Sequence, residues 1–372
     1  MKRDLRQILI QDLKSKMVLL SGPRQVGKTW LAKRVMNNFS YPVYLNHDHR
    51  ESREITKGEL WPERTDFLIL DELHKMPKWK NFLKGVYDTK PPHLSILVTG
   101  SARLDTFTKS GDSLAGRFFR HRLLPFTPKE LVGKSNISLD SLMERGGFPE
   151  PLLSDSPSAH RRWRQNYANS LIRVDILNFV NLGNMRAMNM LFELLRERVG
   201  SNISYSSLGR DLGVSYQTVK KYIEVLEALY VVFRVTPFSK NIARALSKEP
   251  KLYFFDTGLV RGGVGPQFEN MVALALEKEV LAAQDMEGRE TSLHYIRTKD
   301  KEEIDFALAE QGNLRELIES KVRSSKIPKT LYKYVKRLKI PATLVVKEPK
   351  VERQEDTISV RRAAPWLRTL NV

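Results

Sequence analysis

The chain has 372 residues, so we expect two to four folding units rather than one, because a single hydrophobic core stops growing below this length. Lysine and arginine number 62 against 43 acidic residues, a formal net charge of +19, which favours a polyanionic partner over a merely soluble basic surface. The absence of cysteine excludes disulfides and thiolate zinc sites and suits a reducing cytoplasm. No eighteen apolar residues stand together, so we expect no membrane span.

The amino-terminal part alternates short apolar runs with helical stretches. The runs at 17–20, 43–45, 67–70 and 96–98 predict strands of a parallel sheet that is covered on both faces. We therefore expect an α/β domain over residues 1–125. Residues 126–200 lack such runs and carry many basic side chains at helical spacing, which predicts a helical lid subdomain.

A complete phosphate-binding loop of the form G-x-x-x-x-G-K-T follows the first apolar run. It consists of Gly22, Pro23, Arg24, Gln25, Val26, Gly27, Lys28 and Thr29. The two glycines let backbone amides wrap the phosphates, while Lys28 reaches the β- and γ-phosphates and Thr29 offers its hydroxyl to Mg²⁺ at the start of a helix. The loop predicts binding of ATP and Mg²⁺.

Polar residues at the ends of two later strands are expected to complete this site. Asp71 and Glu72 end the third run, where the first would hold Mg²⁺ through water and the second would orient the attacking water. Ser101 follows the fourth run and would sense the γ-phosphate; we prefer it to Thr99 for this role.

Arg117, in Leu-Ala-Gly-Arg, is expected on a loop or helix end at the edge of the same domain. It would act as an arginine finger that stabilises charge on the transferred phosphoryl group in a neighbouring subunit. A surface ion pair is the alternative role. The competing arginines are Arg24, Arg120 and Arg122.

Four segments together are similar to the prokaryotic AAA+ ATPase family whose carboxy-terminal half was long labelled a domain of unknown function. They are residues 21–29, 70–79, 98–101 and 114–117, followed by Leu-Pro-Phe at 124–126. The similarity extends over most of the chain. It implies a RecA-like AAA+ core that often works as a ring, here a homo-oligomer such as a hexamer, followed by a winged helix and a domain of the restriction-endonuclease-like fold.

Residues 201–260 have the pattern of a winged helix-turn-helix. A short helix at 206–212, a turn at Gly213 and a longer helix that begins after Ser215 are predicted, and strands from Tyr230 onward, with Lys240 and Arg244, would form the wing. We expect a core face of Val219, Tyr222, Ile223, Leu226 and Leu229. The opposite face would contact DNA or, in the alternative, a protein; it holds Ser215, Gln217, Thr218, Lys220 and Lys221.

Residues 261–372 form a further α/β pattern in which Glu269 lies on a helix and Asp305, Glu319 and Lys321 lie on strands. This spacing resembles the PD-(D/E)xK nuclease pattern, in which Glu269, Asp305 and Glu319 would hold Mg²⁺ and, with Lys321, activate water for phosphodiester cleavage. The alternative is a retired nuclease fold whose charged residues pair with one another. A basic helix follows and is either a phosphate track or a solvated face; it carries Lys326, Lys329, Lys333, Lys336, Arg337 and Lys339.

These patterns predict a cytoplasmic, DNA-dependent AAA+ ATPase that binds duplex or branched DNA and remodels it or moves along it. Cleavage by the last domain is the further possibility that Asp305, Glu319 and Lys321 raise. The rival hypothesis is an ATP-switched regulator or scaffold with an inactive nuclease-like domain.

Overall fold

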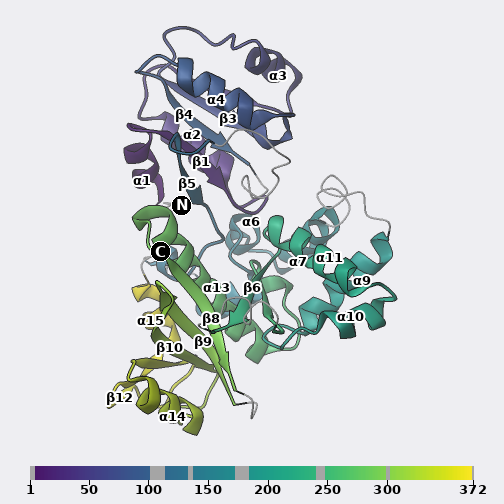
Figure 1. Cartoon of the computed structure of the whole chain (residues 1–372), viewed down its shortest axis with the longest axis vertical. Helices are drawn as coiled ribbons and strands as arrows, with labels where there is room; N and C mark the ends of the chain where they lie inside the picture. Colours follow the sequence, from purple (N-terminus) through teal and green to yellow (C-terminus); the bar gives the residue numbers. More distant parts are fainter. Residues whose placement is uncertain are drawn as a thin grey trace. The chain divides into compact units, whose positions relative to one another are not determined.

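The computed structural model describes residues 5–100, 114–132, 137–171, 184–239, 248–298 and 302–370 (Figure 1). The chain divides into two compact units, Met1–Leu124 (unit 1) and Pro125–Val372 (unit 2). Within these ranges no helix is both long and apolar enough to cross a membrane.

Unit 1 is built around a five-stranded sheet in the order β2-β3-β4-β1-β5, and every neighbouring pair is parallel. The expected α/β fold with a parallel sheet is therefore confirmed. Its elements are α1 (Leu5–Asp12), β1 (Met17–Ser21), α2 (Lys28–Met36), β2 (Pro42–Asn46), α3 (Arg50–Lys57), β3 (Phe67–Asp71), η1 (Leu73–Lys75), α4 (Trp79–Thr89), β4 (Ser95–Thr99) and β5 (Phe118–Arg122). Parallel pairing brings the carboxyl ends of the strands to one edge, the edge at which open α/β sheets bind ligands.

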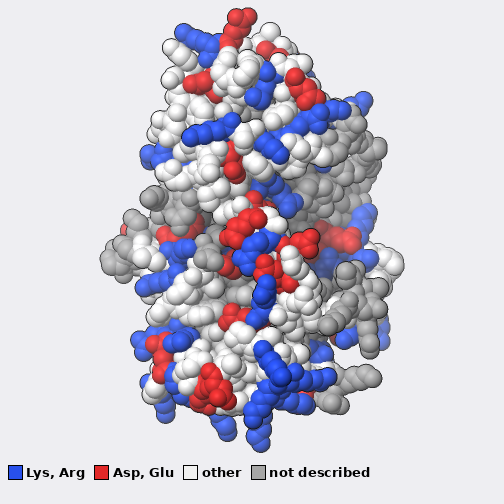
Figure 2. Space-filling model, turned by 60° about the vertical axis from the view of Figure 1, so that its left-hand side comes forward, with Lys and Arg blue, Asp and Glu red and all other residues white. Residues whose placement is uncertain are grey.

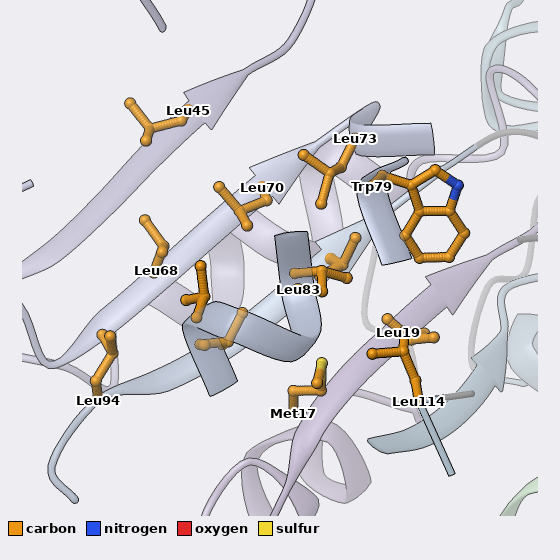
Figure 3. Close-up of a cluster of buried hydrophobic side chains, with 13 residues drawn as sticks. Met17, Leu19, Leu45, Leu68, Leu70, Leu73, Trp79, Leu83, Leu94 and Leu114 are labelled. Carbon is orange, nitrogen blue, oxygen red and sulfur yellow. The ribbon is translucent and has the colours of Figure 1, made fainter. Parts of the chain in front are cut away.

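The core of unit 1 explains why these apolar runs become central strands. All five residues of β1 and of β3 are buried, as expected of strands covered on both faces. Figure 3 shows Leu83 of α4 between side chains of β1 and β3, among them Leu19 and Leu70. This packing holds the sheet edge that carries the phosphate loop.

Unit 2 begins with short helices. They are η2 (Lys129–Leu131), α5 (Leu139–Arg145), α6 (Pro149–Leu153), α7 (Pro157–Ser170), α9 (Met185–Glu197), α10 (Tyr205–Leu212) and α11 (Tyr216–Ala228). Ser204 and Ser215 cap α10 and α11 by accepting hydrogen bonds from backbone amides, and Gly213 takes the left-handed conformation (φ 65°) between them. The predicted core face of α11 is confirmed, since all five of its residues are buried.

An eight-stranded sheet forms the rest of unit 2, in the order β12-β13-β11-β10-β9-β8-β6-β7. The strands are β6 (Val232–Pro237), β7 (Lys251–Phe254), β8 (Thr291–Arg297), β9 (Glu303–Glu310), β10 (Asn313–Lys321), β11 (Ala342–Val346), β12 (Arg353–Glu355) and β13 (Ile358–Arg362). The helices are η4 (Thr257–Leu259), α13 (Val264–Glu287), α14 (Lys329–Leu338) and α15 (Ala363–Thr369). Helix α13 packs against β7, β8 and β10.

The sheet crosses the expected domain boundary at residues 260/261. The hairpin β6–β7 was predicted to be the wing of a separate domain, yet β6 also pairs in parallel with β8 through Thr236↔His294 and Pro237↔Tyr295. This pairing satisfies backbone groups of β8 that would otherwise lie at an open edge. The expected wing residues Lys240 and Arg244 lie outside the described residues.

Candidate functional site

The phosphate loop lies between β1 and α2, as the sequence predicts. Gly22 has φ +144°, and a Cβ placed there would come within 2.1 Å of the Leu123 carbonyl oxygen; Gly27 has φ +99° where α2 begins. Lys28 Nζ donates to the carbonyl oxygens of Gly22 (3.1 Å) and Pro23 (2.7 Å). The ammonium is thus held over the loop, where it can exchange these carbonyls for phosphate oxygens.

Asp71 is the centre of the polar network beside the loop. Its Oδ2 accepts hydrogen bonds from the Thr29 hydroxyl (2.8 Å) and the Tyr44 hydroxyl (2.6 Å), and its Oδ1 accepts one from the Thr99 hydroxyl. These donors come from α2, β2 and β4, which meet at one edge because β4 lies between β1 and β3. Tyr44 was not predicted as a site residue, since an aromatic residue in an apolar strand run carries no signal for a polar role.

Glu72 follows Asp71 in the left-handed conformation (φ 57°), which turns the chain into η1. Burial raises the pKa of Glu72, and the neighbouring Lys28 and Lys75 act against this rise. His74 Nε2 lies 3.7 Å from Glu72 Oε2, but burial lowers the pKa of His74 to about 4, so the contact is no ion pair at neutral pH. Glu72 is a half-buried carboxylate of the kind that accepts a proton or orients water.

Arg117 lies at the opposite end of the sheet from the phosphate loop of its own chain. Its carbonyl oxygen accepts a hydrogen bond from the amide of Met17, the first residue of β1, whereas the loop follows the last residue of β1. Its guanidinium makes a bidentate ion pair with Asp88 of α4, with Nε–Oδ1 at 2.8 Å and Nη2–Oδ2 at 3.0 Å. In this position the guanidinium is held away from the phosphate loop of its own chain. Ser101, the other expected site residue, lies outside the described ranges.

The residues at the loop fit a nucleotide with Mg²⁺. Mg²⁺ prefers oxygen ligands and relies on one or two protein groups together with substrate phosphates and water. The Thr29 hydroxyl and the Asp71 carboxylate, 2.8 Å apart, form such a pair of oxygens. The start of α2 directs its positive end toward the same place.

The expected nuclease residues of unit 2 do come together, but as a network of internal pairs. Asp305 Oδ2 accepts from the Ser320 amide and hydroxyl, both at 2.9 Å. Glu319 Oε1 lies 2.7 Å from Lys321 Nζ, and Glu319 Oε2 accepts from the Asp305 amide at 3.2 Å. Burial, and then the charge of Asp305, raise the pKa of Glu319 to about 7.

Glu269 joins this network from helix α13. Its Oε1 accepts from the Tyr253 hydroxyl (2.8 Å) and lies 3.6 Å from Lys251 Nζ. In the part of the chain that the structure describes, no three Asp, Glu or His side chains gather in a way that suits a metal ion. Glu269 Oε1, Asp305 Oδ2 and both oxygens of Glu319 face donors of the protein, so the described side chains of Glu269, Asp305 and Glu319 do not assemble the expected metal site.

Family models match three successive parts of the chain. Residues 14–132 match a family model described as an AAA domain, and residues 136–265 and 264–364 match two domains of unknown function. An uncharacterised protein of Mycobacterium tuberculosis is 28% identical over 306 residues, covering 79% of this chain and 68% of that protein. One of Haemophilus influenzae is 22% identical over 322 residues, covering 77% and 78%.

Among solved structures, a Walker-type ATPase of Pyrococcus abyssi has a TM-score of 0.44 at 14% identity, over 69% of this chain and 93% of that one. RuvB of Thermotoga maritima has a TM-score of 0.34 at 18% identity, over 62% and 89%. The match to the AAA model and the loop geometry define residues 14–132 as an AAA-type P-loop ATPase domain.

Proposed function

We propose that this protein hydrolyses ATP with Mg²⁺ and uses the reaction to bind and remodel DNA, duplex or branched. The observation that supports the ATPase part is the phosphate loop itself, in which Lys28 is held over the loop carbonyls and the next residue, Thr29, donates to Asp71. Lys28 would bind the β- and γ-phosphates and Glu72 would orient the attacking water and accept its proton. Mg²⁺, when bound, would neutralise charge that develops on the phosphate oxygens.

Exposed basic residues support the choice of DNA as the polyanion. On α11 the exposed side includes Gln217, Lys220 and Lys221, opposite the buried face. We propose that α9 to α11 and the β6–β7 hairpin work as a winged helix with α11 as the DNA-contacting helix. Lysine and arginine also gather at the lower end of Figure 2, the end at which Figure 1 places α14. Lysine side chains there would contact phosphates without reading sequence.

The place of Arg117 supports a homo-oligomeric ring such as a hexamer. Because this arginine lies at the far end of β1 from its own phosphate loop, it would complete the site of a neighbouring copy. It would then leave Asp88 to contact the γ-phosphate. An arginine finger supplied in this way contributes about 10³–10⁵ in turnover in other P-loop NTPases.

The test is the rate of ATP hydrolysis against duplex, single-stranded and branched DNA. We expect stimulation by at least one of these, with affinity that falls steeply as salt is added. The Glu72→Gln variant should bind ATP without turning it over. A rate that no DNA changes would remove DNA from the proposal and leave the ATP-switched regulator or scaffold.

Two matched double variants distinguish a specific role of α11 from a general effect of positive charge. Lys220→Ala with Lys221→Ala removes two exposed lysines from α11, and Lys329→Ala with Lys336→Ala removes two from α14. We expect the first pair to weaken DNA stimulation more than the second. Equal losses would mean that charge alone matters and that α11 has no special role.

A further inference from the structure

Four acidic residues meet on one face of the sheet in unit 2. Glu303 and Asp305 alternate along β9, and the pairing of Phe306 with Ile318 places Asp305 opposite Glu319 of β10. Glu269 approaches the cluster from α13. The charge of Asp305 raises the pKa of Glu269 and of Glu319, second only to burial, so these carboxylates repel one another. Such a cluster needs positive charge.

Lys321 pairs with Glu319, and Lys251 supplies positive charge to the other acids from β7, a strand outside the expected nuclease-like domain. Its Nζ lies 2.6 Å from Glu303 Oε1 and 3.6 Å from Glu269 Oε1, and the residue is only 2% exposed. The charges of Glu269 and Asp305 raise the pKa of Lys251 against the opposing effect of burial. A buried ammonium is costly unless it is paired, so its partners account for its place.

Neighbouring groups leave little room beside the Glu269 carboxylate. The Tyr253 hydroxyl, two residues along β7, donates to the same oxygen that faces Lys251. Gly200, which follows α9 with φ +74°, lies so close that a Cβ there would come within 2.5 Å of Glu269 Oε1. A divalent ion with its water ligands would have to displace these groups, and the fixed ammonium would repel it.

We infer that Lys251 is a built-in cation that takes the place of a divalent metal among Glu269, Glu303 and Asp305. The acidic cluster of unit 2 is complete without a metal, and the lysine joins the β6–β7 hairpin to α13 and β9. This assignment is independent of the ATPase and of DNA binding.

Binding of Mn²⁺ to the full-length chain tests the inference without any activity assay. The Asp71→Asn variant, without nucleotide, removes the metal ligand of unit 1. We expect the Asp71→Asn variant to bind no Mn²⁺. Binding is measured as the loss of the electron paramagnetic resonance signal of free Mn²⁺, and independently by calorimetry. The inference would be overturned if the Asp71→Asn variant bound one Mn²⁺ per chain and the double variant Asp71→Asn, Asp305→Asn did not.

Adding Lys251→Met to Asp71→Asn removes the ammonium and keeps most of the side-chain length. We expect this protein to gain one Mn²⁺ per chain, to lose it again with Asp305→Asn, and to unfold at a higher temperature when Mn²⁺ is present. Lys278→Met is the matched control, since Lys278 is another buried lysine of unit 2 and pairs with Glu130 instead. It should gain no Mn²⁺.

A folded Lys251→Met protein that binds no Mn²⁺ would also overturn the assignment, because the acidic groups would then not form a cation site. Circular dichroism shows whether the variant folds. If the Lys251→Met variant does not fold, comparing Asp71→Asn with and without Asp305→Asn still tests whether the acidic cluster binds Mn²⁺ while Lys251 is in place.

Discussion

The Tyr44 hydroxyl should control how tightly the nucleotide site holds Mg²⁺. Tyr44→Phe deletes the donor that lies 2.6 Å from Asp71 Oδ2 and keeps the ring, whose centroid is 4.7 Å from Lys33 Nζ. A hydrogen bond to a charged group contributes about 1.5–3 kcal/mol, and about 1.4 kcal/mol corresponds to a factor of ten in binding.

The remaining donors set the size of the effect. Thr29 and Thr99 still donate to Asp71 in the variant, so the carboxylate stays oriented in part. We therefore expect the lower end of the range, a loss of about tenfold in Mg²⁺ affinity, as for other residues that hold a metal ligand in place.

The assay is equilibrium binding of a fluorescent ATP analogue as Mg²⁺ is varied. Binding in excess chelator should equal that of the wild type, because the tyrosine hydroxyl contacts Asp71 and Asn46 rather than the phosphate loop. Tyr41→Phe is the control, since Tyr41 is 51% exposed and precedes the same strand. An unchanged Mg²⁺ midpoint in Tyr44→Phe, or an equal shift in both variants, would refute the reasoning.

Three further predictions concern the loop, a buried acid and the arginine at the far sheet edge. Gly22→Ala should lower the free energy of unfolding, measured in urea, by more than the ~1–2 kcal/mol that a side chain costs at positive φ, because the new Cβ also meets a carbonyl oxygen at 2.1 Å. Gly85→Ala in α4 is the control. Its Cβ would have nothing within 4 Å, so the free energy of unfolding should rise by about 0.5–1 kcal/mol. Burial raises the pKa of Asp256 from 3.8 to about 6, so the folded state holds the proton more tightly and stability falls as pH rises from about 4 to about 6. The gap in unfolding free energy between Asp256→Asn and wild type should grow by about 3 kcal/mol between about pH 3 and about pH 7, and a constant gap would contradict the argument. Arg117→Ala should change stability little, since its ion pair with Asp88 is partly exposed, but should lower ATP turnover about 10³-fold or more. Mixing it with Lys28→Ala protein should restore part of the turnover, and a mixture that stays inactive would argue against action between subunits.

Local patterns predicted the parts of the fold that depend on neighbouring residues. The loop from Gly22 to Thr29 is contiguous, and its contacts with the start of α2 follow from that order. Ser215 was expected to cap α11, and it does so because the cap uses an amide three residues away. Such features need no knowledge of how strands pair.

The rest depends on pairings between distant segments. Tyr44 and Thr99 reach Asp71 only because β2 and β4 lie on either side of β3. Lys251 reaches Glu303 because β6 joins the β6–β7 hairpin to β8. No local pattern in the sequence predicts the pairing of β6 with β8. The sequence pattern pointed to Glu269, Asp305 and Glu319 but to neither Glu303 nor Lys251, which pairs with it.

The continuous sheet of unit 2 also has a mechanical consequence. Helix α11 packs on β6, and backbone hydrogen bonds then run from β6 through β8, β9, β10 and β11 to β13. A load applied to α11 would be carried as shear across several strand pairs at once, which resist it together. The helix and the far strands are thus joined through one hydrogen-bonded sheet and not through a flexible linker.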